Sequence, residues 1–164
     1  MINRYSLADH YVQLVFSQNS PNALAGKQFQ IGGAGDNNQP GSFVGSITFA
    51  RENDGWTTEA DATGSWVHNQ SLARHGTVTI SIRQVSDDIL RLMTIMNLYE
   101  QDVSSELVGC TISVYNTNED ELMVAKDCYI SKMPDQVYGE TAANQDWSFV
   151  AGRITPGAKN QLAL

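Results

Sequence analysis

The 164-residue chain has few positively charged residues. Its 10 Lys and Arg residues stand against 18 Asp and Glu residues, which gives a formal net charge of −8 at pH 7. Proteins that bind nucleic acid through the phosphate backbone need a basic face, so this balance argues against that class. The charge does not exclude a surface past which DNA slides without adhering, and it is also ordinary for a soluble protein.

Cysteine and histidine are scarce as well. Cys110 and Cys128 each lie in a strand-like run and could face each other. Buried free thiols are the simpler expectation, because nothing marks an oxidising compartment. His10, His68 and His75 have no second metal ligand at a suitable spacing. We therefore expect no catalytic, metal or cofactor site, and the sequence predicts a protein that is not an enzyme.

Long apolar runs are absent. The N-terminal segment MINRYSLADHY contains no apolar run long enough for a signal peptide. No stretch approaches the ~20 apolar residues that span a membrane. The sequence therefore predicts no membrane anchor, and the cytoplasm is the default location.

The glycine-rich segment Gly32–Gly35 does not predict a nucleotide site. A phosphate-binding loop needs a helix directly after its glycines, so that backbone N–H groups converge on the anion. Here turn-forming residues follow at Asp36–Gly41, and the lysine of such a loop is missing. We expect a turn-rich loop.

The segment from His75 to Gln101 carries the clearest periodicity. Its first half alternates, with Val78, Ile80 and Ile82 on one face, which predicts a strand. Its second half predicts an amphipathic helix at about 87–101. The core face of that helix is expected to contain Ile89, Leu92, Met93 and Met96. Ser86 is the expected N-cap, and Asp87 and Asp88 place negative charge at the positive end of the helix dipole.

Most of the remaining chain is strand-like. Alternation or short apolar runs predict strands at about 9–17, 27–31, 43–51, 110–116, 122–133 and 146–154. In the run 122–133, Leu122, Val124, Cys128 and Ile130 are expected on one face, and Lys126 predicts a bulge or a strand end there. About seven or eight strands and one helix predict a mainly β, antiparallel sandwich or barrel with the helix on its flank. We expect one domain over residues 1–164.

The polar segment between Glu52 and Arg74 contains two tryptophans, Trp56 and Trp66. More than about 20 residues of plain loop would be unusual in a compact domain, so we expect a long hairpin at about 51–74. Two alternatives exist for its tryptophans. They contact another molecule, or they fold back and cover their own sheet.

Several segments, in this order, resemble the family of bacteriophage tail tube proteins: GWTTEADATGSWVHNQSLARHG, GTVTISIR, SDDILRLM, CTISVYN and DWSFVAGRI. Residues Asn144 to Phe149 also resemble the family's N-x-W-x-F strand, with one additional residue after the Asn. The resemblance covers roughly residues 43–155. Ring proteins of type VI secretion look like relatives with the same design.

The resemblance implies a structural protein of the virion. It implies a β-sandwich or barrel with one helix, hexameric rings that form by extending sheets between subunits, and stacking of the rings into a hollow tube that delivers the genome. The implied partners are other copies of the chain and the sheath, tape measure and baseplate proteins. DNA would pass through the lumen without specific binding, and assembly would take place in the host cytoplasm.

The resemblance also places an assembly interface on the long hairpin. Its expected residues are Trp56, Thr57, Thr58, Asp61, Thr63, Gly64, Trp66 and His68. Three other functions stay open. The chain could be a tube initiator, terminator or secreted injection-system ring, or a ligand-binding β-sandwich that uses Trp56, Trp66 and Trp147 as stacking platforms. A small β-barrel enzyme is the least favoured.

Overall fold

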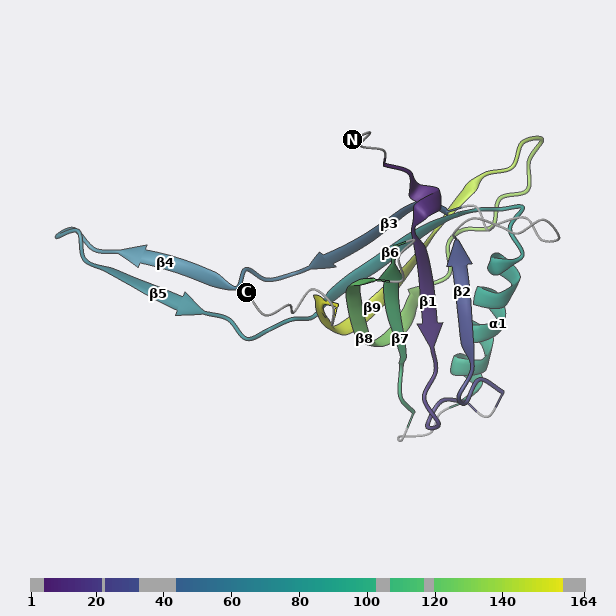
Figure 1. Ribbon diagram of the computed structural model, residues 1–164, viewed down its shortest axis with the longest axis horizontal. Coiled ribbons are helices and arrows are strands. Elements are labelled where there is room, and N and C mark those ends of the chain that lie inside the picture. The colour runs from purple at the N-terminus through teal and green to yellow at the C-terminus, as the bar shows by residue number, and fades with distance from the viewer. Residues whose placement is uncertain (1–4, 22, 33–43, 103–106, 117–119, 158–164) are drawn as a thin grey trace.

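The computed structural model describes residues 5–21, 23–32, 44–102, 107–116 and 120–157. The predicted glycine-rich loop lies almost wholly outside these ranges. The described chain forms nine strands, one short 3₁₀ helix and one α-helix (Figure 1). In chain order the elements are η1 (Leu7–Asp9), β1 (Tyr11–Val15), β2 (Gln28–Gly32), β3 (Val44–Arg51), β4 (Trp56–Ala60), β5 (Trp66–Gln70), β6 (Gly76–Arg83), α1 (Asp88–Gln101), β7 (Cys110–Tyr115), β8 (Glu121–Lys132) and β9 (Asn144–Pro156).

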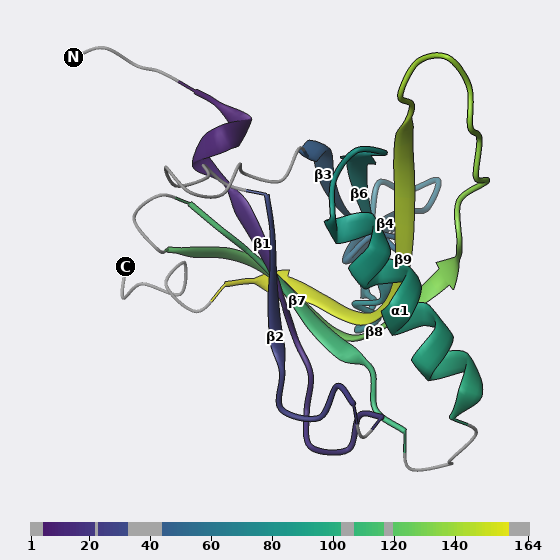
Figure 2. The same cartoon turned by 90° about the vertical axis from the view of Figure 1, so that its right-hand side faces the viewer.

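Seven of the strands form one antiparallel sheet in the order β2-β1-β7-β8-β9-β6-β3. The strand direction turns between β1 and β3, and β9 curves strongly along its length (Figure 2). The remaining strands, β4 and β5, pair with each other as a separate hairpin. The predicted class is therefore confirmed: the fold is mainly β and antiparallel, with one α-helix and one long hairpin.

The core lies between α1 and one face of the seven-stranded sheet. Strands from both ends of the sheet contribute side chains to this core. Within each strand, alternate residues point to the same side of the sheet. The largest of its fully buried side chains are Trp147, Phe16, Phe149, Leu14, Ile80, Ile82, Leu92, Ile112 and Ile154. A single bent sheet and one helix thus enclose the core, and no second large sheet is needed.

Helix α1 begins one residue later than the sequence suggests. The Ser86 hydroxyl accepts a hydrogen bond from the Asp88 N–H at 3.3 Å, although the residue at the N-cap position is Asp87, whose side chain makes no capping bond. Asp88 is only 1% exposed and forms an ion pair of 3.1 Å with Arg91. The Asp88 side chain is therefore buried in the first turn of the helix, and its negative charge lies at the positive end of the helix dipole.

The helix face toward the sheet contains the four predicted core positions. Ile89 and Leu92 are buried, and Met93 and Met96 are partly buried and pack against the core. Ile95 is also buried, and the sequence interpretation missed it.

Strand β8 has a bulge at Lys126 and Asp127, as predicted. Cys110 faces Cys128 and Ile112 faces Ala125, so β7 advances by two residues where β8 advances by three. Asp127 has a φ of 57°, in the left-handed region that an extra residue in a bulge can adopt. A bulge bends its strand, and it contributes to the curvature of the sheet at this level.

The bulge also reverses which side chains of β8 point into the core. Ala125 and Cys128, three residues apart, are both buried in the core. Val124 pairs with Ser113 and lies on the opposite face of the sheet. The prediction that Val124 shares a face with Cys128 is therefore wrong, because simple alternation ignores the extra residue.

The two cysteines face each other on neighbouring strands as buried free thiols. The Cys110 thiol lies 3.5 Å from the carbonyl oxygen of Cys128, to which it can donate. The expectation of free thiols is confirmed.

Burial of the two cysteine thiols and the Tyr99 phenol predicts a loss of stability at high pH. It raises the pKa of the Cys110 thiol well above its usual range and raises the pKa of Cys128 and of the Tyr99 phenol to about 12. These groups ionise first in the unfolded chain, so stability should fall as the pH rises from about 9 toward 12. Melting temperatures between about pH 8 and pH 10.5 test this, and a Cys110→Ala/Cys128→Ala variant should show a shallower decline. An equally steep decline in that variant would contradict the assignment.

Candidate assembly surface

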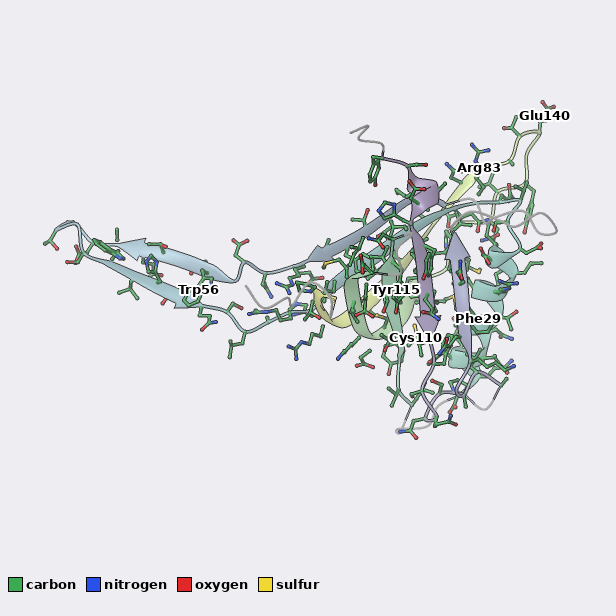
Figure 3. The ribbon with its side chains drawn as sticks, viewed as in Figure 1. Phe29, Trp56, Arg83, Cys110, Tyr115 and Glu140 are labelled. Atoms are coloured by element: carbon green, nitrogen blue, oxygen red, sulfur yellow. The ribbon has the colours of Figure 1, made fainter. Side chains whose placement is uncertain are left out.

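The hairpin of β4 and β5 projects from the body of the molecule as an extended arm, which we define as residues 52–73 (Figure 1). Every residue of β4 and β5 is exposed. The side chains of Trp56 and Trp66 are 63% and 66% exposed, and Figure 3 shows Trp56 on the arm, away from the body. The alternative in which these tryptophans cover their own sheet is therefore wrong.

The register of the arm places both tryptophans on the same face. Trp56 pairs with Gln70, Thr58 with His68, and Ala60 with Trp66. Directly paired residues of an antiparallel ladder share a face, and so do alternate residues of one strand. The resulting tryptophan face consists of Trp56, Thr58, Ala60, Trp66, His68 and Gln70. Its centre is held by a hydrogen bond of 2.8 Å between the Thr58 hydroxyl and Nδ1 of His68.

The tip of the arm is closed by the side chain of Asp61. Its Oδ1 accepts hydrogen bonds from the Thr63 hydroxyl at 2.6 Å, the Thr63 N–H at 2.9 Å and the Ser65 N–H at 3.1 Å. The Thr63 hydroxyl bond is the main reason why the pKa of Asp61 lies below its usual value. Gly64 has a φ of 87°, which suits glycine. The tip is thus a defined turn with a charged carboxylate.

The base of the arm is fastened to the body by hydrogen bonds. The Ser71 N–H donates to the Gly55 carbonyl at 2.8 Å, and Nη1 of Arg74 donates to the Ser71 carbonyl at 2.8 Å. Nε2 of His75 lies 3.1 Å from the Glu52 carboxylate. The Ser71–Gly55 and His75–Glu52 contacts join the two strands at the base of the arm, and the Arg74 bond holds the returning segment in place.

The eight predicted interface residues therefore occupy three places on one arm. Trp56, Thr58, Trp66 and His68 lie on the tryptophan face. The tip contains Asp61, Thr63 and Gly64, and Thr57 lies on the opposite face. An exposed pair of large aromatic side chains on a defined hairpin is typical of a protein–protein contact.

The main sheet has two open edges. Within the described residues β2 pairs only with β1, and β3 pairs only with β6. The outer edge of β3, at Val44–Arg51, is the longer one. Such edges present backbone N–H and C=O groups that can pair with a strand of another chain.

A second projection is the loop between β8 and β9. Gln84, directly after β6, holds the loop by donating to the Val137 carbonyl at 2.8 Å and accepting from the Ala143 N–H at 3.3 Å. Gln136 and the buried Gln145 are joined by a hydrogen bond of 3.0 Å. Tyr138 in this loop is 80% exposed. This loop and the arm leave the body at different ends (Figures 1 and 2).

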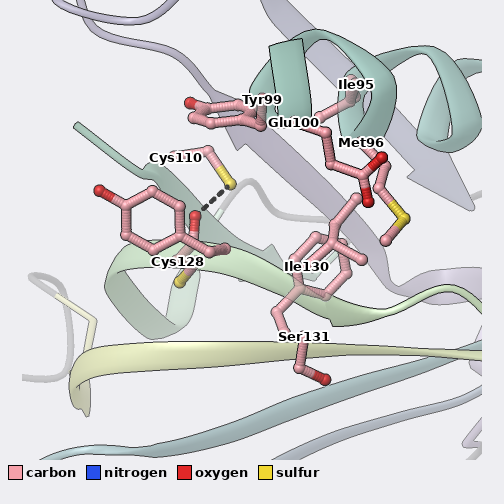
Figure 4. Close-up of a pocket in the computed structure, with 10 residues that line it drawn as sticks. Ile95, Met96, Tyr99, Glu100, Cys110, Cys128, Ile130 and Ser131 are labelled. Atoms are coloured by element: carbon pink, nitrogen blue, oxygen red, sulfur yellow. Dashed lines mark hydrogen bonds between the residues drawn. The ribbon is translucent and has the colours of Figure 1, made fainter. Parts of the chain in front are cut away.

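One cavity of about 240 Å³ lies between α1 and β8 (Figure 4). Its lining is mainly apolar, with Ile95, Met96, Ile130 and Phe149, and Glu100 is its single carboxylate. A catalytic site would need a base or nucleophile paired with an orienting group.

The described residues contain no group of three or more side chains suited to a metal ion. No helix in the described ranges is long and apolar enough to cross a membrane.

The sequence of residues 25–157 matches the family model of the bacteriophage PhiTE tail tube protein. This match covers all elements from β2 to β9, including the arm. The chain belongs to this tail tube family. The resemblance drawn from the order of its segments is thus confirmed, and the family is a structural one. No curated protein matches the sequence.

Two solved structures share the fold. One is the cap that terminates the tube of the anti-feeding prophage, with a TM-score of 0.50, 14% identity, and coverage of 95% of this chain and 93% of that chain. The other is the sheath/tube terminator of the extracellular contractile injection system PVC in its extended state. It has a TM-score of 0.54, 11% identity, and coverage of 96% and 99%. Both matches extend over nearly the whole of each chain.

Proposed function

We propose that this chain is a ring-forming structural protein of a phage tail, and that it acts at the end of the tube as its terminator. The observation that carries the proposal is the exposed arm, because two tryptophans on a defined hairpin indicate a partner. Membership of a tail tube family supports the tube as the place of action. The end of the tube is favoured by the two terminators that match over nearly the whole chain.

A ring of identical copies would use the surfaces described above. The two open edges of the sheet, on β2 and β3, are different strands, so their pairing between copies is head-to-tail. A head-to-tail contact closes into a ring when its rotation permits, and the tail tube resemblance implies a hexamer. The arm then reaches a neighbouring copy, with Trp56, Thr58, Trp66 and His68 as its contacting face.

The main tube subunit is the second candidate, and the name of the family model favours it. In both roles the chain is not an enzyme. Its partners are other tube proteins and, at the tube end, sheath components. The virion tail is its location. The net charge of −8 would keep DNA from adhering to the lumen.

Negative-stain microscopy of the purified chain distinguishes the two candidates. A terminator should form single rings with a central hole that do not grow when the protein concentration is raised. A main tube subunit should form long tubes under the same conditions. A particle that stays monomeric at every concentration would contradict both.

A further inference from the structure

Four cationic residues that are far apart in the sequence are linked by strand pairing and hydrogen bonds near the base of the arm. Lys126 and Arg153 are paired across β8 and β9. The neighbouring Ile154 accepts a hydrogen bond from Nε of Arg51 at 2.8 Å and donates its N–H to the Arg74 carbonyl at 2.7 Å. We call Arg51, Arg74, Lys126 and Arg153 the basal cluster.

The basal cluster lacks carboxylate partners within the described residues. The ion pairs of the described chain are His75 with Glu52 and Arg91 with Asp88, and neither contains a residue of the basal cluster. Of the two acidic residues next to the cluster in sequence, Glu52 contacts His75, and Asp127 accepts the Gly109 N–H at 3.1 Å.

The concentration of charge is unusual for this chain. It has 10 Lys and Arg residues, of which all but Arg4 and Lys159 are described, so the basal cluster holds half of the described cations. A positive patch on a protein of net charge −8 is a candidate binding surface for an acidic partner.

The arm has the complementary composition. Its acidic residues are Glu52, Asp54, Glu59 and Asp61, and it contains no Lys or Arg. Arginine and lysine also bind favourably over the faces of tryptophan rings, which the tryptophan face offers. We propose that the basal cluster of one copy is the docking surface for the acidic arm of a second copy. This inference rests on the proposed function, in which the arm is an assembly contact.

The arm of the same copy cannot fill this surface with its tip. Asp61 lies ten residues beyond Arg51, and five of these residues form β4, which alone spans roughly 17 Å. The arm points away from the body (Figure 1). Charges separated by much more than the Debye length of about 8 Å at physiological salt are largely screened. The contact therefore joins two copies through two different surfaces, which is the head-to-tail geometry of rings and stacks.

A charge-swap experiment on the full chain tests the proposal. The base-reversed variant is Arg153→Glu, the arm-reversed variant is Glu59→Lys, and the swapped variant combines both changes. Lys132→Glu, on the same strand as Lys126, and Glu140→Lys, on the β8–β9 loop, are controls of equal charge change. Sedimentation velocity at two salt concentrations measures association of each variant.

Each reversed variant should associate about tenfold or more weakly than the wild type at low salt, because like charges then face each other. The controls should stay within about threefold of the wild type, and the swapped variant should recover most of the loss. An equimolar mixture of base-reversed and arm-reversed chains should also associate, since each arm then meets a complementary base.

Four outcomes overturn the inference. If the wild type forms rings or tubes and the base-reversed variant behaves like Lys132→Glu, the docking surface is wrong and the proposed function stands. If both reversed variants fail and the swapped variant does not recover, the two surfaces do not meet. If the cluster binds duplex DNA and the arm variants have no effect on association, its partner is the phosphate backbone. A wild-type protein that stays monomeric would contradict both the proposed function and the inference.

Discussion

Replacing residues 57–66 of the arm with a short Gly/Ser turn is expected to leave a folded monomer that no longer assembles. All ten residues of β4 and β5 are exposed and pair only with each other, so their removal takes no side chain from the core. The melting temperature should stay close to that of the wild type, while rings or tubes disappear. Circular dichroism and sedimentation velocity measure the two effects.

A pair of matched substitutions controls this experiment. Trp66→Ala should change the free energy of unfolding by no more than about 0.5 kcal/mol, as exposed positions usually do. Trp147→Ala should cost about 3–5 kcal/mol, because Trp147 is fully buried. A shortened arm that still gives normal assemblies would show that the arm is not the joint. A large fall in its melting temperature would show that the arm supports its own body.

Removing the side chain of Leu92 is expected to destabilise the whole domain. Leu92 of α1 is 0% exposed and belongs to the hydrophobic core. Leu92→Ala loses the transfer free energy of the side chain and leaves a cavity, which together cost about 2–5 kcal/mol. For a domain of this size that corresponds to a fall in melting temperature of roughly 5–15 °C.

Leu90 on the same helix is the matched control. Its side chain is 65% exposed, so Leu90→Ala should have little effect on the free energy of unfolding. Chemical denaturation of the two variants at equal protein concentration gives the comparison. Equal losses in both variants would mean that α1 does not pack on the sheet through this face.

The regular parts of the fold could be predicted from periodicity. The alternation in β6 and the three-to-four spacing in α1 each report one buried face, because a helix and a strand turn their side chains at different intervals. Prediction failed where an extra residue interrupts the interval. At Lys126 and Asp127 the bulge was foreseeable from a charge in an apolar row, but its effect on the phase of Val124 was not.

The candidate site was only partly visible in the sequence. Two tryptophans in a polar segment indicated a hairpin with a partner, but periodicity could not decide whether they covered their own sheet. Their exposure answers that question. The basal cluster was missed, because its four residues are separated by long stretches of chain and meet only through the pairing of β8 with β9 and the contacts of Ile154.

Tryptophan fluorescence across the assembly transition tests the central claim, that the arm is a contact between copies. The chain has three tryptophans, of which Trp56 and Trp66 are exposed on the arm and Trp147 is already buried. Emission should shift to shorter wavelength, and quenching by acrylamide should fall, over the concentration range in which sedimentation shows rings or tubes forming. Assemblies whose tryptophans remain as quenchable as those of the monomer would contradict the account.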